Sequence, residues 1–137
     1  MRFMIIVKAT RDSEAGKQAP ESAFAEMAAY HEALVRAGVL LDGAGLQPSS
    51  KGWRIRYAGD KRTIVDGPFA ETKELIAGYT LIQTKTREEA LEWARRFPNP
   101  TIDHADCEIE VRQLFELEDF EPNPQLQRFE AIKEINR

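Results

Sequence analysis

His31 is the one titratable residue that the spacing of apolar side chains places in the buried stripe of a helix. Apolar residues recur there at three- and four-residue intervals, as on one face of an α-helix. The stripe consists of Phe24, Met27, Ala28, His31, Leu34 and Val35. Histidine suits general acid or base catalysis because its reference pKa lies near neutrality. The alternative is a core histidine whose ring nitrogens are satisfied by the backbone or by a tyrosine.

A second group of polar side chains begins at residues 66–69, which read Asp-Gly-Pro-Phe, and continues with Glu71 and Glu74. Asp-Gly-Pro predicts a sharp turn, because Gly accepts positive φ and Pro fixes its own φ. Asp66, Phe69 and the two glutamates could line a ligand-binding cleft with one aromatic wall. The alternative is a wide hairpin loop whose Phe69 plugs the core. We expect Asp66 to accept hydrogen bonds from backbone N–H groups of the turn.

Asp42 is a candidate carboxylate partner for His31. The chain reverses at Gly38, and the rises of a helix and a strand place His31 and Asp42 level with each other. The sequence leaves open which sheet face Asp42 occupies, because apolar residues stand on both faces of its strand. A carboxylate within reach would orient the imidazole and raise its basicity. The other candidate partners are Asp66, Glu71 and Glu74.

The order of elements predicts an α+β fold. Strands are expected at residues 2–9, 39–46, 76–84 and 106–114, with helices opening at Pro20 and at a Thr86–Glu89 capping box. Residues 52–57 and 62–65 form an inserted β-hairpin. Without the hairpin this is the split βαβ order of ferredoxin-like folds, with both helices on one face of an antiparallel sheet.

Residues 116–137 differ from the domain predicted over residues 1–115. The segment begins acidic and proline-bearing, which indicates a linker or an extended arm. Apolar residues then recur at three-residue intervals and predict a short C-terminal helix: Leu126, Phe129, Ile132 and Ile135. The alternative is a frayed tail, since an isolated helix of this length is not stable in water.

The sheet face without helices predicts a homodimer, because an exposed apolar sheet would be a sticky surface. The side chains on which this prediction rests alternate along two strands: Trp53, Ile55, Tyr57, Cys107, Ile109 and Val111. A second copy packed face to face would cover them.

Composition excludes several classes of function. The net charge of −4 argues against a nucleic-acid partner, and no apolar run approaches the length of a membrane span. A single cysteine, Cys107, permits no intrachain disulfide and favours the cytoplasm. His31, His104 and Cys107 do not form a metal-ligand spacing, and no nucleotide-binding motif is present, so we expect neither metal nor cofactor.

The chain resembles the DGPF-domain branch of the YCII-related family. The resemblance rests on Asp66-Gly67-Pro68-Phe69 with Gly78-Tyr79, on Gly45-Leu46-Gln47-Pro48, on Glu92-Trp93 with Arg96 and Pro98, and on residues 108–112. It implies a dimeric α/β barrel of ferredoxin-like protomers and a helix-one histidine, here His31, as the residue proposed to be catalytic. It also implies an association with sigma-factor systems. Phe97-Pro98 stands where enzymatic relatives carry Asp-Pro, so their His–Asp pair is not retained intact.

Two functions follow from these residues. The first is a ligand-binding or regulatory module with a small-molecule pocket. The second is a cofactorless acid–base enzyme acting on a small cyclic or aromatic molecule, with His31 as general base. In either case we expect the pocket between the sheet-facing side of the first helix and residues 66–74.

Overall fold

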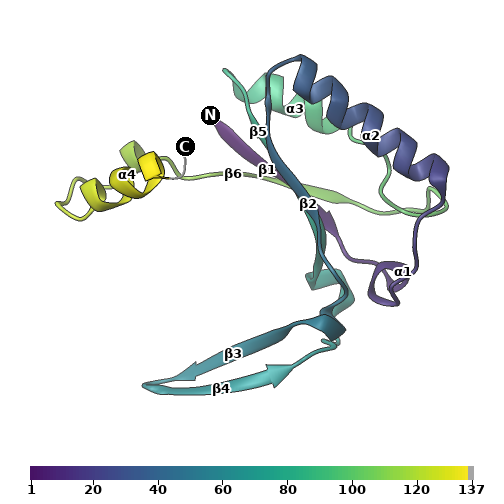
Figure 1. Ribbon diagram of the computed structural model, residues 1–137, viewed down its shortest axis with the longest axis horizontal. Coiled ribbons are helices and arrows are strands. Elements are labelled where there is room, and N and C mark those ends of the chain that lie inside the picture. The colour runs from purple at the N-terminus through teal and green to yellow at the C-terminus, as the bar shows by residue number, and fades with distance from the viewer. Residues whose placement is uncertain (136–137) are drawn as a thin grey trace.

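The computed structural model describes residues 1–135, and its main body is a four-stranded antiparallel sheet. The strand order is β2-β5-β1-β6, the order expected for a split βαβ unit. The strands are β1 (Arg2–Lys8), β2 (Leu40–Gly45), β5 (Ile76–Gln83) and β6 (Ile109–Gln113). Figure 1 shows the helices α2 (Glu21–Arg36) and α3 (Arg87–Arg95) on one side of this sheet. The α+β prediction is confirmed.

Alternation along the two central strands decides which side chains meet the helices. Phe3 pairs with Ile82 and Ile5 pairs with Thr80, and all four are buried on the helix side. Leu34 of α2 and Ala90 of α3 complete this core. The intervening pairs, Met4 with Leu81 and Ile6 with Tyr79, point to the other side and are half-buried. We call Met4, Ile6, Tyr79 and Leu81 the open face.

The helix α2 buries a narrower stripe than the apolar spacing predicts. Tyr30 and Leu34 are buried, whereas Phe24 and Val35 are 55% and 61% exposed. The Tyr30 hydroxyl donates to the Trp93 carbonyl over 2.6 Å and so joins α2 to α3. Burial raises the pKa of Tyr30 from its ordinary value of 10.0 to about 12, so this donor stays protonated well into the alkaline range.

The helix ends follow their sequence signals. Gly38 has φ of 72° directly after α2, a left-handed conformation that favours glycine. Thr86 accepts a hydrogen bond from the Glu89 N–H at the start of α3. The connection between β1 and α2 contains a short helix, α1 (Arg11–Glu14), which is capped by Thr10.

The strands β3 (Trp53–Ala58) and β4 (Lys61–Asp66) form a separate two-stranded sheet that projects from the body (Figure 1). Trp53, Ile55 and Tyr57 therefore belong to the hairpin and not to the main sheet. The other side chains on which the homodimer prediction rests also do not lie on the sheet face without helices. Ile109 and Val111 pair with Val7 and Ile5 on the helix side, and the exposed Cys107 precedes β6. The prediction of which side chains form the bare face of the sheet was therefore wrong. The residues on that face are those of the open face.

The predicted C-terminal helix is present as α4 (Leu126–Ile135). It follows a short 3-10 turn, η3 (Leu117–Asp119), and has no buried residue. The Arg2 guanidinium donates twice to the Glu116 carboxylate, over 2.7 and 3.1 Å, and attaches the arm to β1. Among residues 1–135, no helix has the length and apolar character needed to cross a membrane.

Candidate functional site

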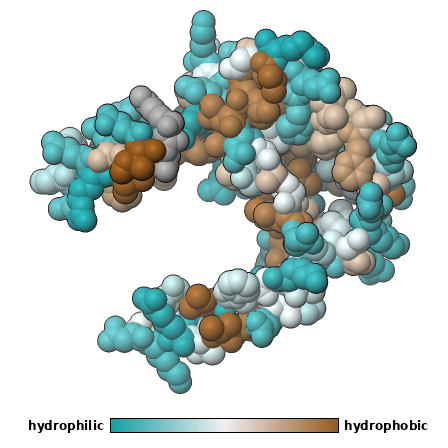
Figure 2. Space-filling view, viewed as in Figure 1, coloured by the Kyte–Doolittle hydropathy of each residue, from teal (hydrophilic) through white to brown (hydrophobic). Residues whose placement is uncertain are grey.

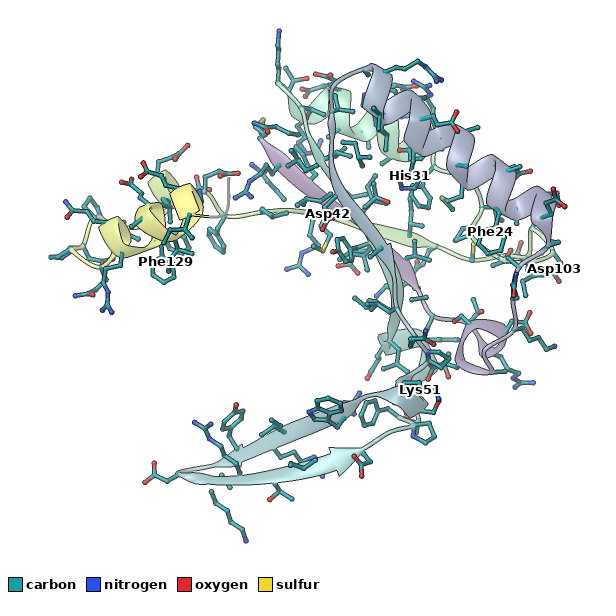
Figure 3. All side chains as sticks on the ribbon, viewed as in Figure 1. Phe24, His31, Asp42, Lys51, Asp103 and Phe129 are labelled. Atoms are coloured by element: carbon teal, nitrogen blue, oxygen red, sulfur yellow. The ribbon has the colours of Figure 1, made fainter. Side chains whose placement is uncertain are left out.

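His31 points from α2 toward the sheet, as the spacing predicts (Figure 3). Its Nδ1 lies 2.8 Å from the Met27 carbonyl oxygen, and its Nε2 lies 2.8 Å from the Thr80 hydroxyl on β5. Tyr30 and Phe97 stand edge-on to the ring, with centroid distances of 5.6 and 6.4 Å. Both nitrogens are satisfied, and the ring is held by helix, strand and aromatic neighbours together.

These contacts define the tautomer of the neutral ring. A carbonyl oxygen can only accept, so Nδ1 carries the proton and donates it to Met27. The Nε2 lone pair is then free to accept the Thr80 hydroxyl proton. Nε2 is thus the basic atom of this imidazole, and a ligand with a hydrogen-bond donor would compete with Thr80 for it.

A cavity of about 420 Å³ adjoins His31 on the helix side of the sheet. Its walls are mainly apolar side chains and strand backbone: Val7, Met27, residues 43–45, residues 77–80, Phe97 and Pro100. This volume falls within the range of small-molecule sites, which combine apolar walls with few polar groups. The His31 ring and the Thr80 hydroxyl are those polar groups, and the described lining includes no carboxylate.

Glycines on β2 help keep this cavity open. A methyl group at Gly43 would lie 3.6 Å from His31 Nε2 and 3.7 Å from the Thr80 hydroxyl, so Gly43 faces the imidazole directly. A methyl group at Gly45 would meet nothing within 4 Å. Because Gly43 and Gly45 have no side chains, they leave room for the cavity beside β2.

Asp42 lies on the opposite face of the sheet from His31. Its neighbour Gly43 faces the imidazole, and successive strand residues alternate between faces. The Asp42 carboxylate instead accepts a hydrogen bond from the Tyr79 hydroxyl over 2.9 Å, a contact that raises the pKa of Tyr79. A pair between His31 and Asp42 does not form within the protomer.

The segment after β4 is fastened to the rest of the chain by Ser49. The Ser49 N–H and hydroxyl both donate to the Glu14 carboxylate, and the Ser49 hydroxyl accepts from the Phe69 N–H over 3.0 Å. A methyl group at Gly67 would overlap the Ser49 carbonyl oxygen, so only glycine fits there. The Asp66 carboxylate forms no hydrogen bond within residues 1–135, contrary to the turn role expected for it.

The other residues of this segment do not line the cavity beside His31. The Phe69 ring lies under the Arg54 guanidinium at 3.8 Å, next to the hairpin. Glu71 is the N-cap of the 3-10 turn η2 (Thr72–Glu74), and Glu74 is the last residue of that turn. Both side chains are exposed. Within one protomer, the cavity beside His31 is therefore not the one expected between the first helix and residues 66–74.

Sequence reasoning missed Thr80, the Gly43–Gly45 wall and Phe97. A usable signal was present: Gly78 and Thr80 share the strand parity of the buried Ile82, and Gly43 and Gly45 share one parity on the next strand. Small or hydroxyl side chains at alternate positions indicate a space above a sheet. Phe97, noted in the sequence only because it stands where enzymatic relatives carry Asp, forms part of the cavity wall.

Comparisons with known proteins identify the sequence family of the chain. An uncharacterised protein of Rhizobium meliloti (strain 1021) is 31% identical over 99 residues, which are 72% of this chain and 80% of that relative. A solved structure of 5-chloro-2-hydroxyhydroquinone dehydrochlorinase (TftG) from Burkholderia phenoliruptrix AC1100, in complex with 2,5-dihydroxybenzoquinone, aligns with a TM-score of 0.45 and 14% identity. That alignment covers 84% of this chain and 94% of the enzyme, and it assigns neither a substrate nor a reaction here. The model of the YCII-related domain matches residues 1–116, and the chain belongs to this family.

Proposed function

We propose that this protein is a homodimeric ligand-binding module whose site is the cavity beside His31. One observation carries the proposal: a single oriented imidazole and one hydroxyl face a mainly apolar space of about 420 Å³. Such a site selects a small, largely apolar molecule with one hydrogen-bonding group. A phenol, a cyclic alcohol or an enol could donate to Nε2 and accept from the Thr80 hydroxyl.

Binding is tested by a thermal-shift screen of small phenols and cyclic ketones on the full chain. We expect hits to raise the melting temperature of the native protein but not that of Gly45→Ala, whose methyl group enters the cavity without touching the protein. Gly52→Ala, outside the cavity, is the matched control. Hits that bind native protein and Gly45→Ala equally would place the ligand elsewhere.

A second candidate, a cofactorless acid–base enzyme, is favoured by the tautomer. With Nδ1 donating to Met27, Nε2 has the lone pair that a general base needs. The expected activity is proton removal from a carbon or hydroxyl of a bound cyclic molecule. Proton NMR of each hit in D₂O tests this. Exchange or conversion that is lost in His31→Gln supports the enzyme, and unchanged spectra with retained binding support the ligand-binding module.

A further inference from the structure

The hairpin β3–β4 and the arm (residues 116–135) project from the same side of the body and leave a hollow between them (Figures 1 and 2). The open face lies on the body between these two projections. Both projections are weak structures when alone, since a two-stranded hairpin and a ten-residue helix are each marginal in water. Each therefore needs a covering surface.

One face of the hairpin carries four exposed apolar side chains; Arg62 and Asp66 share this face, and the Arg62 guanidinium lies 4.9 Å from the centroid of the Tyr57 ring. Residues directly opposite in an antiparallel pair share a face. Ile55 pairs with Ile64, and Trp53 and Tyr57 share their parity, so these four side chains lie on one face. All are exposed, Tyr57 and Ile64 to 65% and 67%. We call them the hairpin apolar face.

The arm presents a matching apolar edge. Phe129, Ile132 and Ile135 recur at three-residue intervals on α4 and are at least half exposed. Phe129 projects from α4 into the hollow (Figure 3). The hairpin and arm of one chain stand at opposite ends of the hollow, so these two apolar surfaces do not meet within a protomer.

The charges of the two projections are complementary. Five basic and two acidic residues stand in 51–66, whereas six acidic and two basic residues stand in 116–135. Opposite net charges steer two surfaces together and disfavour like-charged pairings such as hairpin on hairpin. A two-fold rotation that packs two open faces together can bring each hairpin to the partner's arm.

We propose that the apolar face of the hairpin of one copy packs on the arm of a second copy. The proposal rests on the homodimer proposed above and adds a reciprocal clasp at both ends of the paired sheets. The hairpin and the arm of each copy would be stabilised by packing against the arm and the hairpin of the other copy.

Zero-length carbodiimide cross-linking of the unmodified full chain tests the clasp. An equal mixture of ¹⁵N-labelled and unlabelled protein is incubated so that subunits exchange between dimers. The mixture is then cross-linked and digested. We expect mixed-isotope links from Lys61 of the hairpin, or from Lys51 just before it, to carboxylates of residues 116–135. A monomer by sedimentation overturns both the clasp and the homodimer. A dimer without mixed hairpin–arm links overturns the clasp alone.

Charge reversal gives an independent measurement. The hairpin variant Arg56→Glu/Lys61→Glu/Arg62→Glu should raise the dimer dissociation constant roughly tenfold or more. Adding Glu121→Lys/Glu130→Lys/Glu134→Lys in the arm should restore it. The control Lys85→Glu/Arg87→Glu/Arg95→Glu, near and on α3, should leave dimerisation unchanged. A double-reversed protein as weak as the hairpin variant would refute the clasp, provided that circular dichroism shows both proteins folded.

Discussion

The His31 imidazole is a rigid group and not a freely rotating one. Its two ring nitrogens contact a carbonyl one helical turn away and a hydroxyl on β5, both at 2.8 Å. A ligand that binds to Nε2 therefore meets an atom whose direction is already fixed, which lowers the entropic cost of recognition.

Thr80→Val should remove the Thr80 hydroxyl while keeping a side chain of nearly the same volume. The side chain is buried, so losing its hydrogen bond should lower the free energy of unfolding by about 1 kcal/mol in urea titration. Most of this loss should disappear in a His31→Leu background, because the two residues share one bond. The exposed Thr63→Val should be near neutral. An equal cost of Thr80→Val in both backgrounds would show that the bond contributes nothing.

Gly67→Ala should be among the costliest alanine substitutions in the chain. Gly67 is not one of the described glycines with positive φ, so its requirement is steric: the new methyl group would overlap the Ser49 carbonyl. We expect a loss of roughly 2 kcal/mol or more in the free energy of unfolding. Gly52→Ala, whose methyl group would lie 3.7 Å from the same oxygen, should be much milder. Similar melting temperatures for the two variants would contradict this.

At the scale of elements, local signals predicted much of the fold. The Thr86 cap, the chain reversal at Gly38 and the strands expected at residues 2–9 and 76–84 each depend on neighbouring residues, so they can be read from sequence. The side of β2 on which Asp42 lies could not be read, because residues on both faces are apolar there. The structure shows a register shift between Leu40 and Asp42, which no alternation rule anticipates.

The candidate site was only partly predictable for the same reason. His31 was found by helical periodicity, but its partner Thr80 lies 49 residues away and has no charge to draw attention. The Asp-Gly-Pro-Phe turn was found by composition, yet its fastening depends on Glu14 and Ser49 from two other segments. Long-range contacts between side chains leave little trace in a single sequence.

Arg2 and Glu116 should attach the arm in a pH-dependent way. The Arg2 hydrogen bonds hold the pKa of Glu116 below its usual 4.5, so the ion pair contributes its full stability above pH 4.5. This contribution is lost as the pH falls through the lower, folded value. Glu116→Gln should therefore increase hydrogen exchange in α4 at pH 7, by an amount worth about 1 kcal/mol or less. Below the folded pKa of Glu116, native protein and variant should exchange alike. A difference that persists there would mean that charge is not the cause.

The whole molecule exposes more apolar surface than a monomer needs. The hairpin apolar face and the apolar edge of the arm are exposed, and a hollow lies between the hairpin and the arm (Figure 2). We expect sedimentation to give twice the 15.6 kDa mass of the chain. Leu81→Glu, which places a charge on the open face, should yield monomers. Leu91→Glu, on the exposed side of α3, should not. If Leu81→Glu remains a dimer, the interface does not lie on the open face.

The cavity and the open face are back to back on the same two strands. Gly43 pairs with Thr80 on the cavity side, while the adjoining Asp42 and Tyr79 are hydrogen-bonded on the other side. The two surfaces are separated by a single layer of backbone, and a shift of β2 along β5 displaces both. In the proposed dimer, occupancy of the cavity and association of the protomers would be thermodynamically linked, and linkage is reciprocal. Ligand affinity should accordingly change with protein concentration, and a saturating ligand should change the dissociation constant of the dimer.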